Sequence, residues 1–418
     1  MKKLFKTMAL LAMLCAAIPA VAAEAPGYGV TIGGRIRADM GWQMLDKSQW
    51  GNKTDDAITN FFATVNTNSY LRAVFTSADK TSGAHIELGL GAITNQRNNG
   101  TEVNDSVSLR HAYGWWKAGS CKLIVGQFAG RLGDRILPGN NLGSNKSGKT
   151  DLQGFGFIGG TRNPKVALQM EVNDNFGFEV AIGQAGSEAN TFSMYDKNVS
   201  ATGSTNSYLP RLEMVFDFKF GNFLITPGFG VSYQNFKLND TGADDSTLSY
   251  LLLLPVKYQN GPFYIMLNGL YGQNADSDWT GEQGASWNDN FSPSSGRHYG
   301  GQPGVLPMMK GKQVEDTSYW GIGMGMGYAF TERVELKTGA GLANLSNDAW
   351  DKGGSSNDNY TRWGAFVALR YKLTDNFTIA PEIAYYNYGD KVGKDFAPGD
   401  EQKAGDEWLV GIHFQILF

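Results

Sequence analysis

The last eleven residues of the chain, 408–418, alternate strictly between two kinds of side chain. Every second position carries a large apolar residue: Trp408, Val410, Ile412, Phe414, Ile416 and Phe418. Period two is the period of a β-strand, so one whole face of this strand is apolar. A chain end in water normally frays, whereas a strand that closes a barrel in lipid meets acyl chains outside and pairs on both sides. The pattern predicts a membrane-embedded β-barrel.

The two ends of the chain indicate export. The ending on Phe418 resembles the C-terminal signature of bacterial outer-membrane barrels, which an assembly machinery reads. This resemblance makes Trp408, Phe414 and Phe418 the expected assembly signal. At the other end, basic residues precede an apolar run over residues 8–18, and small residues precede Glu24, an order typical of a secretory signal peptide. We expect a signal peptide at residues 1–23 and a single barrel domain at residues 24–418.

Composition excludes several functions. No stretch after residue 23 approaches the ~18 consecutive apolar residues of a membrane-spanning helix. The chain carries 36 Lys and Arg against 40 Asp and Glu, the opposite of the basic surface that nucleic-acid binding needs. Cys121 is the only cysteine after residue 23, so an intrachain disulfide is excluded there. The four histidines lack metal or triad spacing, so we expect no metal site, no cofactor and no enzymatic activity.

Segments of alternating polarity recur along the whole chain. There are about sixteen, near residues 28–44, 59–77, 84–93, 106–116, 121–129, 164–172, 176–184, 208–219, 223–236, 248–259, 263–273, 317–330, 334–345, 361–373, 377–388 and 407–418. Short and long connections alternate between them. If both chain ends are periplasmic, every short turn is periplasmic and every long loop is extracellular, as in outer-membrane barrels. The sequence predicts an all-β fold, a 16-stranded antiparallel transmembrane β-barrel.

This architecture resembles the general trimeric porins of bacteria, and its texture is closest to the homotrimeric outer-membrane porins of sulfate-reducing bacteria. The resemblance implies a homotrimer in the outer membrane, among its lipids and lipopolysaccharide, with a water-filled channel in each subunit. Ions and small hydrophilic solutes would cross by passive diffusion. The resemblance also implies that the loop after the fifth strand, residues 130–163, folds inward and narrows the barrel.

Two other classes of protein are alternatives. An outer-membrane enzyme built on a barrel uses fewer strands and a grouped nucleophile and base, and the sequence shows no such group. A structural or adhesive barrel with a plugged lumen is the second alternative. It is suggested by the long loop at residues 274–316, which carries Trp279, Trp287 and Phe291.

Charged residues fall on one parity of the predicted strands. An Arg or Lys facing lipid costs ~2–4 kcal/mol at the membrane midplane, so this parity is expected to face the lumen. Opposed charges across a narrow pore create a transverse field, although each arginine could instead pair locally with a carboxylate. Arginine predominates, so we expect weak anion preference or near-neutral selectivity. The candidates for the pore constriction are Arg35, Arg37, Asp39, Arg72, Arg110, Arg131, Asp134, Arg135, Arg362 and Arg370.

Two further patterns concern packing. Outer faces of predicted strands near the N-terminus suit close contact between subunits, and the trimer-interface candidates there are Ala84, Leu88, Ala92 and His111. The run at residues 321–327 has glycine at every second position, on the lumen face of its strand. No helix pattern follows it, so it is not a nucleotide-binding loop. A flexible wall patch is the favoured interpretation, and a docking groove for a loop is the alternative.

Overall fold

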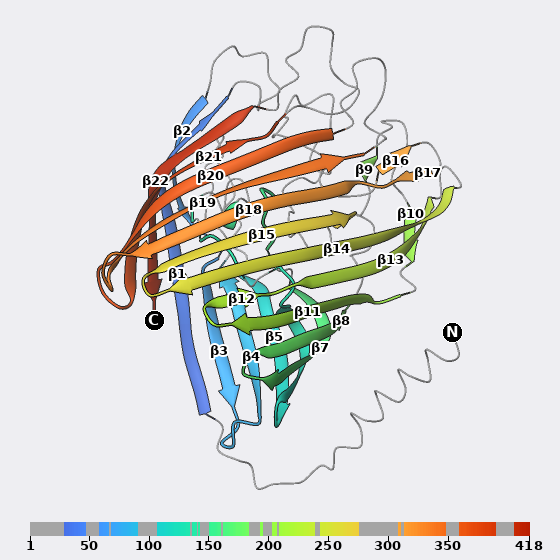
Figure 1. Ribbon diagram of the computed structural model, residues 1–418, viewed down its shortest axis with the longest axis horizontal. Helices are drawn as coiled ribbons and strands as arrows, with labels where there is room; N and C mark the ends of the chain where they lie inside the picture. Colours follow the sequence, from blue (N-terminus) through green and yellow to red (C-terminus); the bar gives the residue numbers. More distant parts are fainter. Residues whose placement is uncertain are drawn as a thin grey trace.

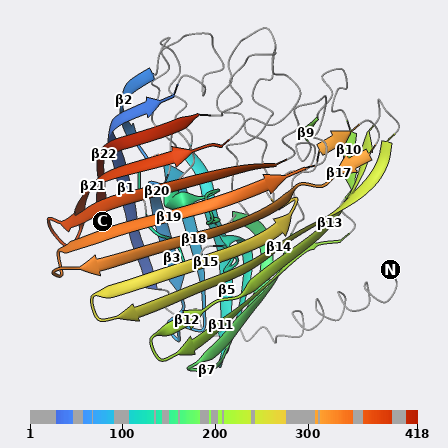
Figure 2. The ribbon, with the colours of Figure 1, turned by 45° about the horizontal axis from the view of Figure 1, so that its top comes forward.

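The computed structural model is a closed antiparallel barrel of sixteen strands. The chain runs around the barrel from blue to red, so that its first and last strands become neighbours (Figure 1), and the view in Figure 2 is tilted to bring the top forward. The structure describes residues 29–46, 58–66, 68–90, 107–133, 136–139, 141–142, 150–159, 162–183, 193–194, 203–206, 209–238, 243–275, 308–310, 313–347, 359–389 and 405–418.

The barrel strands are β1 (Gly29–Leu45), β2 (Ile58–Val65), β3 (Tyr70–Thr76), β4 (Ser82–Leu90), β5 (Val107–Ala118), β6 (Cys121–Ala129), β7 (Arg162–Asn173), β8 (Phe176–Gly183), β10 (Gly203–Asn206), β11 (Arg211–Phe220), β12 (Phe223–Ile225), β13 (Gly228–Leu238), β14 (Ala243–Asn260), β15 (Phe263–Gln273), β18 (Ser318–Ala329), β19 (Val334–Ser346), β20 (Asn359–Lys372), β21 (Phe377–Asn387) and β22 (Asp406–Leu417). Breaks divide three of the sixteen strands into the pairs β2 and β3, β10 and β11, and β12 and β13. The predicted fold is confirmed.

Outside the barrel, β9 (Ser193–Met194), β16 (Met308–Lys310) and β17 (Gln313–Glu315) form a small separate sheet. It joins segments that lie far apart in the sequence, because β9 pairs in parallel with β16 while β16 pairs antiparallel with β17. No helix in the described part of the chain is long and apolar enough to cross a membrane.

The barrel closes where β1 pairs antiparallel with β22. Phe418 extends this pairing, because the Gly34 amide donates to the Phe418 carbonyl at 2.8 Å and the Phe418 amide donates back to Gly34 O at 3.2 Å. Trp408 and Phe418 face outward, with 44% and 58% of their surface exposed, and Phe414 is half-buried on the same face. The alternation of the last strand therefore places its apolar side chains on the outside of the barrel.

Aromatic side chains line the outer face near the strand ends. Trp363, Tyr385 and Trp408 cross β20, β21 and β22 with ring centroids 4.9 and 4.7 Å apart. Phe176 and Phe218 stack at 5.1 Å near the other end of the barrel, beside the short turns. Such rings anchor a barrel at the two headgroup regions of a membrane.

A bulge between β4 and β5 changes which residues face outward. The pairing shifts between Glu87 and Leu88, so that Glu87 lies opposite His111 and Leu88 lies opposite Leu109. Ile86 on the outer face is 43% exposed, whereas the neighbouring Glu87 is 5% exposed inside. His111 therefore faces inward, and its predicted place on the outer face is wrong, because simple alternation fails across a bulge. The other interface candidates, Ala84 and Leu88, lie on the outer face, while Ala92 is outside the described residues.

One carboxylate closes the short turn between β3 and β4. Asp79 accepts hydrogen bonds from the Ser77 hydroxyl at 2.6 Å and from the amide and hydroxyl of Thr81 at 3.1 and 2.8 Å. These bonds favour the ionised form and lower the pKa of the Asp79 carboxyl to about 2. The connection predicted near residues 78–83 is thus a tight turn that aligns two antiparallel strands.

Candidate functional site in the barrel interior

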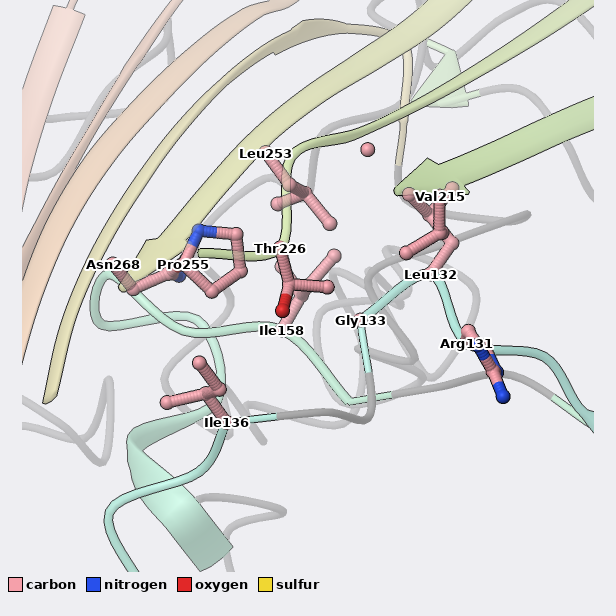
Figure 3. Close-up of a pocket in the computed structure, with 11 residues that line it drawn as sticks. Arg131, Leu132, Gly133, Ile136, Ile158, Val215, Thr226, Leu253, Pro255 and Asn268 are labelled. Carbon is pink, nitrogen blue, oxygen red and sulfur yellow. The ribbon is translucent and has the colours of Figure 1, made fainter. Parts of the chain in front are cut away.

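The segment between β6 and β7, here called the inward loop (residues 130–161), folds into the barrel over its described parts, as the family resemblance implies. Its described parts are residues 130–133, 136–139, 141–142 and 150–159. Leu132 and Ile158 of the loop belong to one buried cluster with side chains of β11, β14 and β15. Figure 3 shows Leu132 beside Val215 of the wall, with Ile158 and Leu253 among the other side chains that line a small pocket. The loop is therefore packed against the wall rather than suspended in the channel.

Alternate glycines on β18 and β19 make room for the inward loop. At Gly323 a β-carbon would lie 2.6 Å from ring carbons of Phe157, and at Gly341 it would lie 2.8 Å from the carbonyl carbon of Phe155. Non-bonded carbon atoms prefer roughly 3.5–4.0 Å, so any side chain at these positions would displace the loop. The glycine run at residues 321–327 contributes to a docking groove for the loop. The favoured interpretation as a flexible wall patch is wrong.

Hydrogen bonds from wall side chains hold the inward loop in place. Asn268 Nδ2 on β15 donates to Gly156 O at 2.8 Å. The Glu382 carboxylate on β21 accepts from the backbone amides of Asn141 and Leu142 at 2.8 and 3.0 Å. Because backbone donors occupy both its oxygens, Glu382 contributes to loop position rather than to an open acidic surface.

Carboxylates near the start of the inward loop are paired with cations. The Arg131 guanidinium contacts Asp217 Oδ2 at 2.8 Å, and the Arg131 amide donates to Glu179 Oε1 at 2.8 Å. Glu213 nearby contacts Arg211 at 2.7 Å. All three carboxylates are nearly inaccessible to solvent. A buried carboxylate is stable when paired and hydrogen-bonded, so this part of the interior presents little net negative charge.

A group of arginines occupies the inner wall formed by β1, β3 and β5. We call Arg35, Arg37, Arg72 and Arg110 the arginine cluster. Three of its guanidinium carbons surround the Tyr70 ring, at 4.8 Å (Arg35), 6.0 Å (Arg72) and 5.8 Å (Arg110) from the ring centroid. The negative face of an aromatic ring attracts a cation without neutralising it.

Two of the four members of the arginine cluster have no paired carboxylate among the described residues. Arg110 contacts Glu87 Oε1 at 2.7 Å. Within the described part of the chain, Arg35 and Arg72 form no ion pair with a carboxylate, whereas Arg37 interacts electrostatically with Asp151 and Asp39. Uncompensated charge on the wall of a narrow aqueous channel produces a local field that attracts ions of the opposite sign. The arrangement of these side chains therefore makes the electrostatic potential positive at the inner wall formed by β1, β3 and β5.

Comparison with known proteins identifies the class of this barrel. A family model described as the porin subfamily matches residues 165–411, which is more than half of the chain. The chain belongs to the porin subfamily. This porin is an outer-membrane channel through which solutes diffuse passively. No curated protein matches the chain.

Solved structures of other channels share the fold of this porin. The outer membrane channel DcaP of Acinetobacter baumannii is 17% identical, with 95% of this chain and 99% of that chain covered and a TM-score of 0.65. The anion-selective porin from Comamonas acidovorans is 10% identical, with 94% and 100% covered and a TM-score of 0.55. The trimer form of OmpT from Vibrio cholerae is 12% identical, with 94% and 100% covered and a TM-score of 0.50. At these identities the likeness shows the fold.

The predicted constriction residues of the porin occupy different settings. Four of them form the arginine cluster, whereas Arg131 is paired near the start of the inward loop. Arg362 is only 5% exposed, with its guanidinium carbon 5.4 Å from the Phe155 ring centroid. Arg370 lies 3.4 Å from Glu335 Oε2. Of the predicted constriction arginines, those that lie together on one wall are thus the four on the strands near the N-terminus.

Asp39 belongs to the seam of the barrel rather than to its constriction. Its Oδ1 lies 2.6 Å from His413 Nδ1 on β22, and its Oδ2 accepts from Asn66 Nδ2 at 2.9 Å. Only 2% of Asp39 is exposed. The expectation that this carboxylate faces the pore is wrong, because partners from other strands enclose it. The remaining candidates, Asp134 and Arg135, lie outside the described residues.

Two charged groups of the interior were not among the predicted constriction residues. Asp151 of the inward loop accepts a hydrogen bond from the Gly139 amide at 2.9 Å, and it interacts electrostatically with both Arg37 and Lys337 of the wall. Only the folded path of the loop brings these groups together, so no local pattern could have revealed them. In the described part of the chain, no group of three or more His, Cys, Asp or Glu side chains is arranged to hold a metal ion.

Proposed function

We propose that this porin is a passive diffusion channel whose interior favours small anionic solutes over cations. The observation that carries the proposal is that the carboxylates inside the barrel are neutralised by partners, whereas some of the arginines are not. Carboxylates beneath the inward loop have cationic or amide partners, whereas Arg35 and Arg72 have neutral or aromatic ones. The free charge on the inner wall is therefore mainly positive.

The net charge of the whole chain points the other way. It is −4, which would favour cations at the extracellular surface. Exposed charges are screened over ~8 Å at physiological salt, whereas a narrow pore with low-dielectric walls concentrates the field of the groups that line it. The arginine cluster therefore outweighs the net charge. Among the channels that share the fold, the one from Comamonas acidovorans is named anion-selective.

Reversal potentials in a salt gradient test the proposal. The native channel should be more permeable to anions than to cations. The double variant Arg35→Ala and Arg37→Ala should reduce this permeability ratio about fourfold, since one charge ~8 Å from the permeating ions, screened at physiological salt, changes the ratio of local anion to cation concentration about twofold. Lys80→Ala with Lys117→Ala removes two charges at the periplasmic rim and serves as the matched control. Cation selectivity that the arginine substitutions leave unchanged would contradict the proposal.

The assembly and targeting of the porin are further proposals. We propose a homotrimer in contact with outer-membrane lipids and lipopolysaccharide, supported by the apolar outer faces and by the trimer form of the Vibrio cholerae channel. Residues 1–23 act as a signal peptide, residues 24–418 form one barrel domain, and the chain is not an enzyme. The assembly machinery reads Trp408, Phe414 and Phe418. The pattern of strands and connections along the sequence most resembles that of porins from sulfate-reducing bacteria.

A further inference from the structure

The second barrel strand is interrupted opposite the arginines of β1. β2 ends with Val65 paired to Ala38, and β3 begins with Tyr70 paired to Arg35. Four residues of the chain, 66–69, thus connect positions that are separated by only two residues on β1, Ile36 and Arg37, and residues 66, 68 and 69 of these four are described. We call these four residues the strand-two turn. The second strand thus holds two more residues here than β1. Because side chains alternate between the two faces with a period of two, the extra pair leaves the inward and outward faces of β2 and β3 unchanged.

The described residues of the strand-two turn are tightly held. The Ser69 amide donates to Asn66 O at 2.9 Å, and the Asn68 amide donates to Asn66 Oδ1 at 2.8 Å, the pattern of an Asn-stabilised turn. The Arg37 amide donates to Ser69 Oγ at 2.9 Å, and the Leu90 amide donates to Ser69 O at 3.0 Å. Asn66 and Ser69 are completely buried. The turn is thus fixed between β1 and β4.

Asn68 of this turn faces two members of the arginine cluster. Its backbone carbonyl accepts hydrogen bonds from Arg35 Nε at 3.3 Å and from Arg35 Nη2 at 3.0 Å. Its side-chain carbonyl accepts from Arg110 Nη1 at 3.4 Å. Asn68 therefore contacts guanidinium groups from both β1 and β5, which would otherwise repel each other beside Tyr70.

The chemistry of these acceptors decides what the arginines present to the channel. A carboxylate at this position would hold the guanidinium groups and also cancel their charge. Amide oxygens hold them in a defined geometry and carry no net charge. We propose that the strand-two turn, through Asn68, is a positioning element that orients the guanidinium groups of Arg35 and Arg110 without adding a negative charge beside them, and so supports the anion preference. This inference rests on the proposed function.

A purely structural role for the turn is the rival explanation, and a deletion separates the two. Removing residues 67 and 68 leaves two residues, Asn66 and Ser69, to pair with Ile36 and Arg37 of β1. The ladder of hydrogen bonds then becomes regular, and no side chain of the flanking strands changes face. The shortened channel should assemble and conduct. Its anion-to-cation permeability ratio should fall about twofold, the effect of one charge moved ~8 Å from the ion path in water. An unchanged ratio in a conducting deletion variant would overturn the inference.

Asn68→Asp tests the same idea without changing the backbone. It keeps the size of the side chain and adds one negative charge at the arginines, so the ratio should fall at least about twofold. Thr31→Asp is the control, because it adds the same charge to the inner face of β1 about 13 Å along the strand from Arg35. Equal effects of both substitutions would overturn the inference, since position would then be irrelevant.

The native channel distinguishes failure of this inference from failure of the proposed function. A native channel without anion preference refutes the proposed function and this inference with it. An anion-preferring native channel whose ratio survives both the deletion and Asn68→Asp refutes the positioning role alone. Channel assembly, measured by trimer stability in mild detergent, should stay within the native range for Asn68→Asp. If the selectivity of this variant falls only together with its assembly, the inference is contradicted.

Discussion

Replacing Gly341 by alanine should push the inward loop off the barrel wall and into the channel. A β-carbon at this position would lie 2.8 Å from the Phe155 carbonyl carbon, and the carbonyl oxygen would lie closer still. Restoring an ordinary carbon–carbon contact of about 3.5 Å requires the loop to retreat by at least about 0.7 Å. The wall itself cannot yield as easily, because β19 is paired on both sides with β18 and β20.

The retreat disturbs two interactions that hold the loop. The bond from Asn268 Nδ2 to Gly156 O, now 2.8 Å, would stretch to about 3.5 Å, at the limit of a hydrogen bond. The Phe155 ring, 5.1 Å from the Tyr386 ring centroid, would lose part of its packing. Overpacking of this kind typically costs about 1–3 kcal/mol. A loop weakened by this amount should fluctuate more than the native loop.

Single-channel recording in planar bilayers measures both consequences. Gly341→Ala should lower the mean conductance, since the loop moves from the wall toward the lumen, and should raise the open-channel noise. Gly269→Ala on β15 is the matched control, because a β-carbon there meets nothing within 4 Å. Native conductance and native noise in Gly341→Ala would refute the idea that the glycine groove determines the position of the loop.

Two further predictions concern assembly. Deleting Phe418 removes the paired backbone bonds to Gly34 that finish the β1–β22 seam, so surface levels measured by protease accessibility on whole cells should collapse; normal levels would contradict our view of the C-terminus. Leu88→Arg places a charge on the outer face, at a cost of ~2–4 kcal/mol near the midplane, so native mass spectrometry in mild detergent should change from three chains to one. A stable trimer of this variant would place the interface elsewhere.

Local pattern was sufficient for the barrel itself. Most strand segments in the sequence show period two, and each short turn limits its two neighbours to antiparallel pairing, so the number of strands and most of the inward and outward faces follow from nearby residues. Arg362 and Arg370 illustrate this, because both lie on the predicted inner face of β20 opposite the exposed Trp363 and Val367. The inward loop was expected from family resemblance and its position after the fifth strand.

Tertiary structure alone decided where alternation breaks and which charges remain uncompensated. His111 turned inward because a bulge shifted its pairing with β4, and Asp39 became buried because β22 brought His413 against it. The glycines at residues 321–327 accept the inward loop from a distant part of the sequence, and Asn68 reaches Arg110 across the intervening strand β4. Each of these outcomes depends on contacts between residues far apart in the chain. Strand period is a property of neighbours in sequence, whereas compensation of charge is a property of neighbours in space.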